Sequence, residues 1–155
     1  MQFDHKYWMS QAIDLAKKVK YDVPVAALIV KDNVLISKGT NEVEVFEDPT
    51  AHAEIRAIKD AANALSNWRL MGCTLYTTLE PCAMCAGAII NSRLKKVIFG
   101  AYDTNAGACG SKINLFSVLD KENQIEVIGG VMELETSKLL KDFFIQRRKS
   151  NCQLT

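Results

Sequence analysis

Two short motifs constrain this chain more than any other feature: His52-Ala53-Glu54 and Pro81-Cys82-Ala83-Met84-Cys85. Each stands where irregular or extended chain gives way to a helical pattern. Cys82 and Cys85, at positions i and i+3 of one helix, project to the same side, and a helix N-terminus favours the thiolate form that binds metals. With His52 they supply three ligands for one metal ion.

This ligand set is typical of a catalytic zinc site. Three protein ligands leave one position of a tetrahedral zinc ion open, whereas a structural site is closed. Water would fill that position, and zinc lowers the pKa of the water to about 7. Glu54, which follows His52 by two positions, is placed to carry the proton. We therefore expect one Zn²⁺ per chain, held by His52, Cys82 and Cys85, with Glu54 as the catalytic residue. An H-x-E motif followed by P-C-x-x-C is the signature of zinc-dependent nucleobase deaminases.

Composition bounds the class of protein. A chain of 155 residues, of which 48% are apolar, is expected to form one globular domain over residues 1–155, with about residues 150–155 as a mobile tail. The net charge of +1 gives no overall signal for nucleic-acid binding. The five cysteines, an odd number, favour thiols or metal ligands over disulfides. No signal peptide and no apolar run of about 18–20 residues is present, so we expect a cytoplasmic protein without a membrane partner.

The apolar patterns predict helices and strands in alternation. Asp4 is a candidate N-cap for the first helix, Asp48-Pro49-Thr50 for the second, and Pro81 suits the first position of the third. Residues 41–48 look irregular, and residues 102–124 form a long connection that is a candidate functional element. The predicted helices cover 4–19, 48–65, 82–91 and the C-terminal region around Leu139 and Phe143; the predicted strands cover 25–30, 34–36, 74–79, 97–100 and 125–128.

Several stretches outside the two motifs carry a resemblance to a known family. They are His5-Lys6-Tyr7-Trp8-Met9, Val23-Pro24-Val25, Asn41, Asp48-Pro49-Thr50-Ala51, Thr78-Leu79-Glu80, Ala86-Gly87-Ala88, Phe99-Gly100-Ala101, Gly110-Ser111 and Asp142-Phe143-Phe144. Over nearly its whole length the chain resembles the bacterial tRNA-specific adenosine deaminases of the cytidine-deaminase-like superfamily. The resemblance implies a three-layer α/β/α fold with a mixed five-stranded sheet, a homodimer, and hydrolytic conversion of adenosine to inosine at the wobble position, residue 34, of a tRNA anticodon.

The same resemblance implies contacts to the anticodon stem-loop. It assigns a hydrogen bond with the nucleoside to Asn41 and pocket walls to Val23 and Leu79, with Ala53 as a further substrate-binding residue. Asp103 would contact the sugar and backbone of the nucleotide, Phe144 would lie beside flipped bases, and Arg147 and Arg148 would face phosphates. By pattern alone, Val23 and Leu79 would be core residues, and the C-terminal Arg-Arg-Lys run would be a solvated charge cluster.

Two alternative functions remain open at this point. A free nucleobase or nucleoside deaminase acting on guanine, cytosine or cytidine would keep all four residues of the metal site. A catalytically silent zinc- or RNA-binding subunit would need neither an open zinc position nor Glu54.

Overall fold

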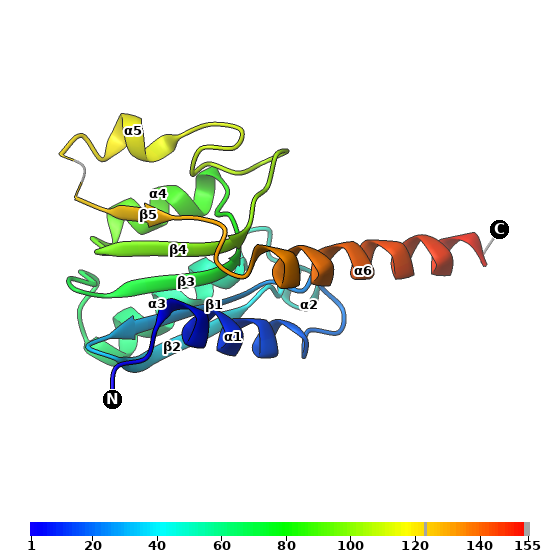
Figure 1. Ribbon diagram of the computed structural model, residues 1–155, viewed down its shortest axis with the longest axis horizontal. Helices are drawn as coiled ribbons and strands as arrows, with labels where there is room; N and C mark the ends of the chain where they lie inside the picture. The colour runs from blue at the N-terminus through cyan, green and yellow to red at the C-terminus, as the bar shows by residue number, and fades with distance from the viewer. Residues whose placement is uncertain (123, 154–155) are drawn as a thin grey trace.

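A mixed five-stranded sheet forms the centre of the molecule (Figure 1). The computed structural model describes residues 1–122 and 124–153. The strand order is β2-β1-β3-β4-β5, with β1 antiparallel to both of its neighbours and with β3, β4 and β5 parallel. The strands are β1 (Ala26–Lys31), β2 (Val34–Thr40), β3 (Thr74–Leu79), β4 (Lys96–Ala101) and β5 (Glu126–Ile128).

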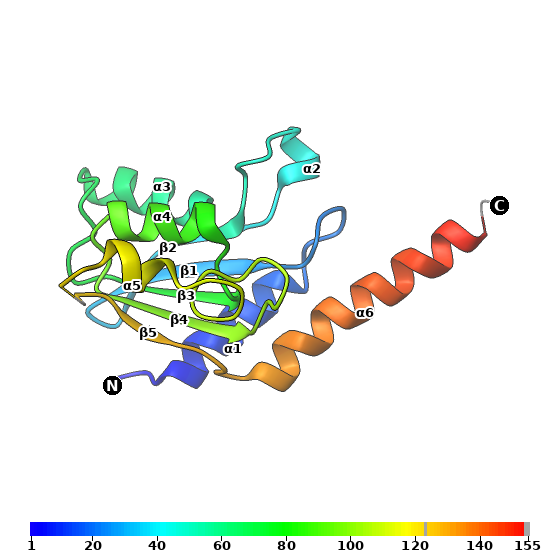
Figure 2. The ribbon, with the colours of Figure 1, turned by 90° about the horizontal axis from the view of Figure 1, so that it is seen from above.

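Helices cover both faces of this sheet (Figure 2). On one face lie α3 and α4, with α5 beside α4, and on the other lie α1 and the first turns of α6. The helices are α1 (His5–Ala16), α2 (Val43–Phe46), α3 (Ala53–Leu65), α4 (Ala83–Asn91), α5 (Leu115–Leu119) and α6 (Glu133–Cys152). The expected three-layer α/β/α fold is confirmed.

The sequence of β1 is a continuous apolar run because helices cover this strand on both faces of the sheet. Successive side chains of a strand point to opposite sides. Ala27 and Ile29 accordingly join the core under α3 and α4, while Leu28 and Val30 join a second core with Trp8 of α1. A strand buried on both sides reads as a continuous apolar stretch, as the sequence does here.

The starts of two helices differ from the sequence prediction. Asp48 accepts hydrogen bonds from the backbone and side chain of Thr50, at 2.8 and 2.7 Å, and so forms a turn before α3 instead of its cap. The N-cap of α3 is His52. Pro81 precedes the helix, because the chain is still extended at Cys82, which pairs with Gly107 in an isolated bridge and is itself the N-cap of α4.

Two short helices were not predicted. α2 lies in the segment expected to be irregular. A residue distant in sequence stabilises its N-terminus, because the buried Asp22 carboxylate accepts a hydrogen bond from Glu44 N at 2.8 Å. α5 lies in the long connection and is capped by Asn114. Helices of four and five residues are too short to show an apolar period. At the other end of the chain α6 extends to Cys152, into the segment 150–155 expected as a tail, of which Leu154 and Thr155 lie outside the described residues.

Close packing of β2 against α3 sets the position of the first motif. A Cβ at Gly39 would overlap the carbonyl oxygen of Ala53 and lie 2.8 Å from Ala57 N. The strand therefore approaches the helix backbone directly, at the turn that carries His52 and Glu54.

Candidate active site

The two predicted motifs meet at the N-termini of α3 and α4. His52 Nδ1 lies 3.6 Å from Cys82 Sγ and 3.5 Å from Cys85 Sγ. Typical zinc bond lengths are about 2.0–2.1 Å to nitrogen and about 2.3 Å to sulfur, so the edge of a tetrahedral site that joins N to S is about 3.6 Å. The observed spacing fits that edge, and the three side chains could hold one zinc ion.

Hydrogen bonds and burial shift the pKa values of both cysteine ligands. A hydrogen bond from Cys85, with a further one from His52, lowers the pKa of Cys82 to about 4 despite its burial. The same hydrogen bond to Cys82, together with burial, raises the pKa of Cys85. The thiolate is the form of cysteine that ligates zinc, so the lowered pKa of Cys82 favours metal binding.

Glu54 lies beside the ligands in the first turn of α3. Its side chain is only 4% exposed and faces the same cavity as His52 and Cys82. Loss of hydration raises the pKa of the Glu54 carboxyl. A carboxyl group with a raised pKa holds a proton more readily than an exposed one, and a general acid–base must both accept and release a proton.

A cavity of about 240 Å³ opens over these residues. The structure brings five of the predicted substrate-binding residues into its lining, namely Val23, Asn41, Ala53, Leu79 and Asp103. Val23 and Leu79 are therefore walls of the cavity, and both also pack against the main core. The volume lies below the range of about 300–1,000 Å³ typical of sites for drug-sized ligands and suits a single nucleobase.

Asn41, a residue of the cavity lining, has a side-chain acceptor without a donor. Its Nδ2 donates to Val23 O at 3.3 Å, which orients the amide. Its Oδ1 is buried, and none of the described residues donates to it. A buried acceptor without a donor is costly, so a donor that reached this oxygen would stabilise the site.

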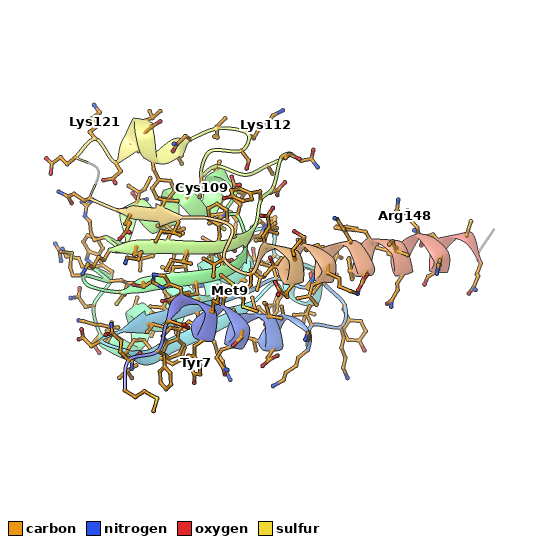
Figure 3. The ribbon with its side chains drawn as sticks, viewed as in Figure 1. Tyr7, Met9, Cys109, Lys112, Lys121 and Arg148 are labelled. Carbon is orange, nitrogen blue, oxygen red and sulfur yellow. The ribbon has the colours of Figure 1, made fainter. Side chains whose placement is uncertain are left out.

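The other three predicted residues lie apart from the cavity lining. Phe144, Arg147 and Arg148 stand on α6, which projects beyond the body of the protein, and Figure 3 shows Arg148 on this projecting part. Phe144 is 46% exposed, its ring packs edge-on against Phe143, and the Arg147 guanidinium lies 5.9 Å from the centre of the Phe143 ring.

Sequence reasoning assigned no role to three other residues of the lining, Val25, Glu80 and Ala106. Val25 looked like an ordinary strand residue, and Ala106 carries no chemical signal. Glu80 could have been noticed from its position immediately before Pro81 and Cys82. Its partners, described below, come from a distant loop that no sequence pattern connects to it.

Fold and site together are those of a deaminase with a His/Cys/Cys group that could hold a metal ion. The chain matches the sequence model of the MafB19-like deaminase family over residues 3–148. It is 44% identical over 151 residues to a tRNA-specific adenosine deaminase of Haemophilus influenzae, covering 96% of this chain and 87% of that protein. The chain belongs to the family of tRNA-specific adenosine deaminases.

Two solved deaminase structures resemble the chain. One comes from a study of A-to-I editing by tRNA:A34 deaminases at the wobble position of transfer RNA; it has 36% identity and a TM-score of 0.83, and covers 88% of this chain and 100% of its own. A guanine deaminase from Bacillus subtilis has 39% identity and a TM-score of 0.63, over 75% of each chain.

Among the described residues, no helix is long and apolar enough to span a membrane.

Proposed function

We propose that this protein catalyses the zinc-dependent hydrolytic deamination of adenosine to inosine at the wobble position of a tRNA anticodon. One observation carries the proposal: the cavity that contains Glu54 and two of the three metal-ligand residues lies in a chain 44% identical to a tRNA-specific adenosine deaminase. The reaction replaces the amino group on C6 of adenine by an oxygen atom from water and releases ammonia.

The metal would be held by His52 Nδ1 and the sulfurs of Cys82 and Cys85. Zinc bound there supplies a water molecule whose pKa is lowered to about 7. Glu54 would move both protons of the water molecule: its carboxylate accepts the first and delivers it to N1 of the adenine ring, then accepts the second from the hydroxyl group at C6 and delivers it to the amine that leaves. The burial of Glu54 keeps this exchange out of bulk solvent.

The rest of the cavity would hold the nucleoside. Val23 and Leu79 form apolar walls for the base. Asn41 would hydrogen-bond the nucleoside, and Asp103, which also lines the cavity, would contact its sugar and backbone. Because C6 of adenine is inaccessible in a stacked helix, the target must be flipped out of the anticodon loop.

The projecting part of α6 would hold the RNA on either side of that nucleotide. The exposed ring of Phe144 offers a surface on which an unpaired base can stack. Arg147 and Arg148 would contact phosphates, which position the RNA without reading its sequence.

We further propose a homodimer that acts in the cytoplasm together with its tRNA substrate. No layer formed by the described residues covers the outer surfaces of α3 and α4 (Figure 2), and Met84 of α4 is 37% exposed. A Cβ at Gly87 would meet no atom of the described part of the chain within 4 Å. Gly87→Trp should therefore keep the fold and shift the mass in sedimentation from dimer to monomer. A wild-type mass equal to one chain would overturn this part of the proposal.

The substrate is tested by incubating the zinc-loaded protein with an anticodon stem-loop that carries a wobble adenosine, followed by nucleoside analysis. Inosine is the expected product. The similarity to a guanine deaminase makes free guanine the second candidate substrate, so ammonia release from guanine is measured in parallel. Turnover of guanine with no inosine in the stem-loop would replace the proposal by that alternative.

A further inference from the structure

Glu80 is a buried carboxylate between β3 and the first cysteine of the metal site. It is 2% exposed, and in the described parts of the chain none of the ion pairs involves it. Burial of a carboxylate costs several kcal/mol unless hydrogen bonds compensate for the lost water. The partners of this group therefore identify what it holds in place.

All of these partners belong to one loop, residues 103–111. Glu80 Oε2 accepts from the amides of Cys109 at 3.1 Å and Ser111 at 3.2 Å. Glu80 Oε1 accepts from the Ser111 hydroxyl and from the amide of Asp103 at 3.4 Å. Several amides that converge on one point form a binding site for an anion, and here the anion is a side chain of the protein itself.

The loop reaches Glu80 because Gly107 has no side chain. A Cβ at Gly107 would overlap Glu80 Oε2 and the carbonyl oxygen of Asp103. Next to this contact Ala108 N donates to Pro81 O at 2.8 Å, and Gly107 pairs with Cys82 in an isolated antiparallel bridge. The loop is thus fastened both to Glu80 and to the chain segment that carries a metal ligand.

This loop forms one wall of the cavity. Asp103 and Ala106 line it, on a different segment from Val23 and Asn41. The Asp103 carboxylate accepts from the amides of Asn105 at 3.0 Å and Ala106 at 3.1 Å, so the turn and the side chain are oriented together. Both Glu80 oxygens are already engaged with the loop, which leaves them without a role in proton transfer.

We propose that Glu80 is a positioning residue: by holding residues 103–111 against the metal-ligand segment, it places the Asp103 wall of the cavity and thereby sets the binding of the substrate nucleotide. The inference rests on the proposed function. Its effect should appear mainly in KM, because Glu54 and the three metal ligands stay where they are.

The test compares three variants of the zinc-loaded protein. Glu80→Gln keeps the size of the side chain, but either orientation of its amide group sets an N–H against an N–H of the loop. Ser111→Ala removes a single donor. Asp120→Asn is the matched control, since the Asp120 carboxylate also accepts from two loop amides, of Gln124 at 3.2 Å and Ile125 at 2.9 Å, outside the cavity.

For Glu80→Gln we expect KM for the stem-loop to rise about tenfold or more and kcat to fall less than about threefold, because a misplaced wall weakens the binding of substrate and transition state alike. Zinc content should remain one per chain. Ser111→Ala should raise KM about threefold, as expected for one lost hydrogen bond, and Asp120→Asn should match the wild type. Amide hydrogen exchange should quicken in residues 103–111 of Glu80→Gln and stay slow in α3 and α4.

A wild-type KM in Glu80→Gln would overturn the inference. Loss of zinc or of protection in α4 would also overturn it, because Glu80 would then support the metal ligands rather than the cavity wall. If the wild-type protein leaves the stem-loop unchanged but deaminates guanine, the proposed function fails. The role of Glu80 is then judged separately, from the KM of the same variants for guanine.

Discussion

Replacement of Glu54 by glutamine removes the ability of this side chain to carry a proton and changes little else. The side chain is buried in the cavity beside the metal ligands, and the amide has nearly the same size and keeps a carbonyl acceptor. It cannot accept and release a proton at neutral pH. If Glu54 carries the protons of the reaction, Glu54→Gln should fold and bind zinc normally and should fail in turnover.

The expected loss follows from the number of proton transfers. A positioned general acid–base contributes about 10²–10⁴-fold to a rate. Glu54 would serve both the ring nitrogen and the leaving amine, so we expect kcat to fall by about 10⁴-fold, which corresponds to about 5 kcal/mol of transition-state stabilisation. KM should change little, because the contacts attributed to Asn41, Asp103 and α6 remain.

The assay is conversion of a stem-loop under single-turnover conditions, with inosine quantified by chromatography and zinc measured on the same sample. Glu135→Gln is the matched control, because Glu135 is likewise a glutamate in the first turn of a helix but lies outside the cavity. Zinc-loaded Glu54→Gln that turns over within about tenfold of the wild type would refute the proton-carrying role.

Three further predictions concern the metal, the packing of α3 and the RNA contact. Cys85→Ser should lose zinc during dialysis, because a serine hydroxyl is a poor zinc ligand, whereas Cys73→Ser, in the core, should keep one zinc per chain by elemental analysis. Gly39→Ala should lower the free energy of unfolding by about 1–3 kcal/mol in a denaturant titration, because the added methyl overlaps the backbone of α3; an unchanged midpoint would contradict the packing. Arg148→Ala should leave kcat unchanged and reduce the slope of log KM against log salt by about 0.7, the value for one lost phosphate contact on single-stranded RNA, and an identical slope would exclude that contact.

That His52, Cys82 and Cys85 come together was predictable because each of the two motifs is a local pattern. His52 and Cys82 both stand at helix starts, where the chain direction is set by the next few residues, and Cys85 follows one turn later. The apolar periods likewise predicted the five strands and the long helices. Boundaries shifted where a distant partner intervened, as at Pro81, where pairing with the loop around Gly107 keeps the chain extended for one more residue.

The interactions that hold the site in place could not be predicted in this way. Glu80 reads as one more acidic residue in the sequence, and only the fold brings residues 103–111 around it. Asp22 is a similar case, since its carboxylate caps α2 across a gap in sequence. The unused acceptor of Asn41 also depends on the fold. Nδ2 donates to Val23 O, and none of the described residues donates to Oδ1.

The central claim is that this site deaminates the wobble adenosine of a tRNA. The most direct test is to treat an intact tRNA that has adenosine at the wobble position and other unpaired adenosines with zinc-loaded protein, and to map inosine by reverse transcription, which reads it as guanosine. We predict conversion at the wobble position alone, and none with Glu54→Gln. An unmodified wobble adenosine, with ammonia released from free guanine or cytidine by the same preparation, would contradict the account.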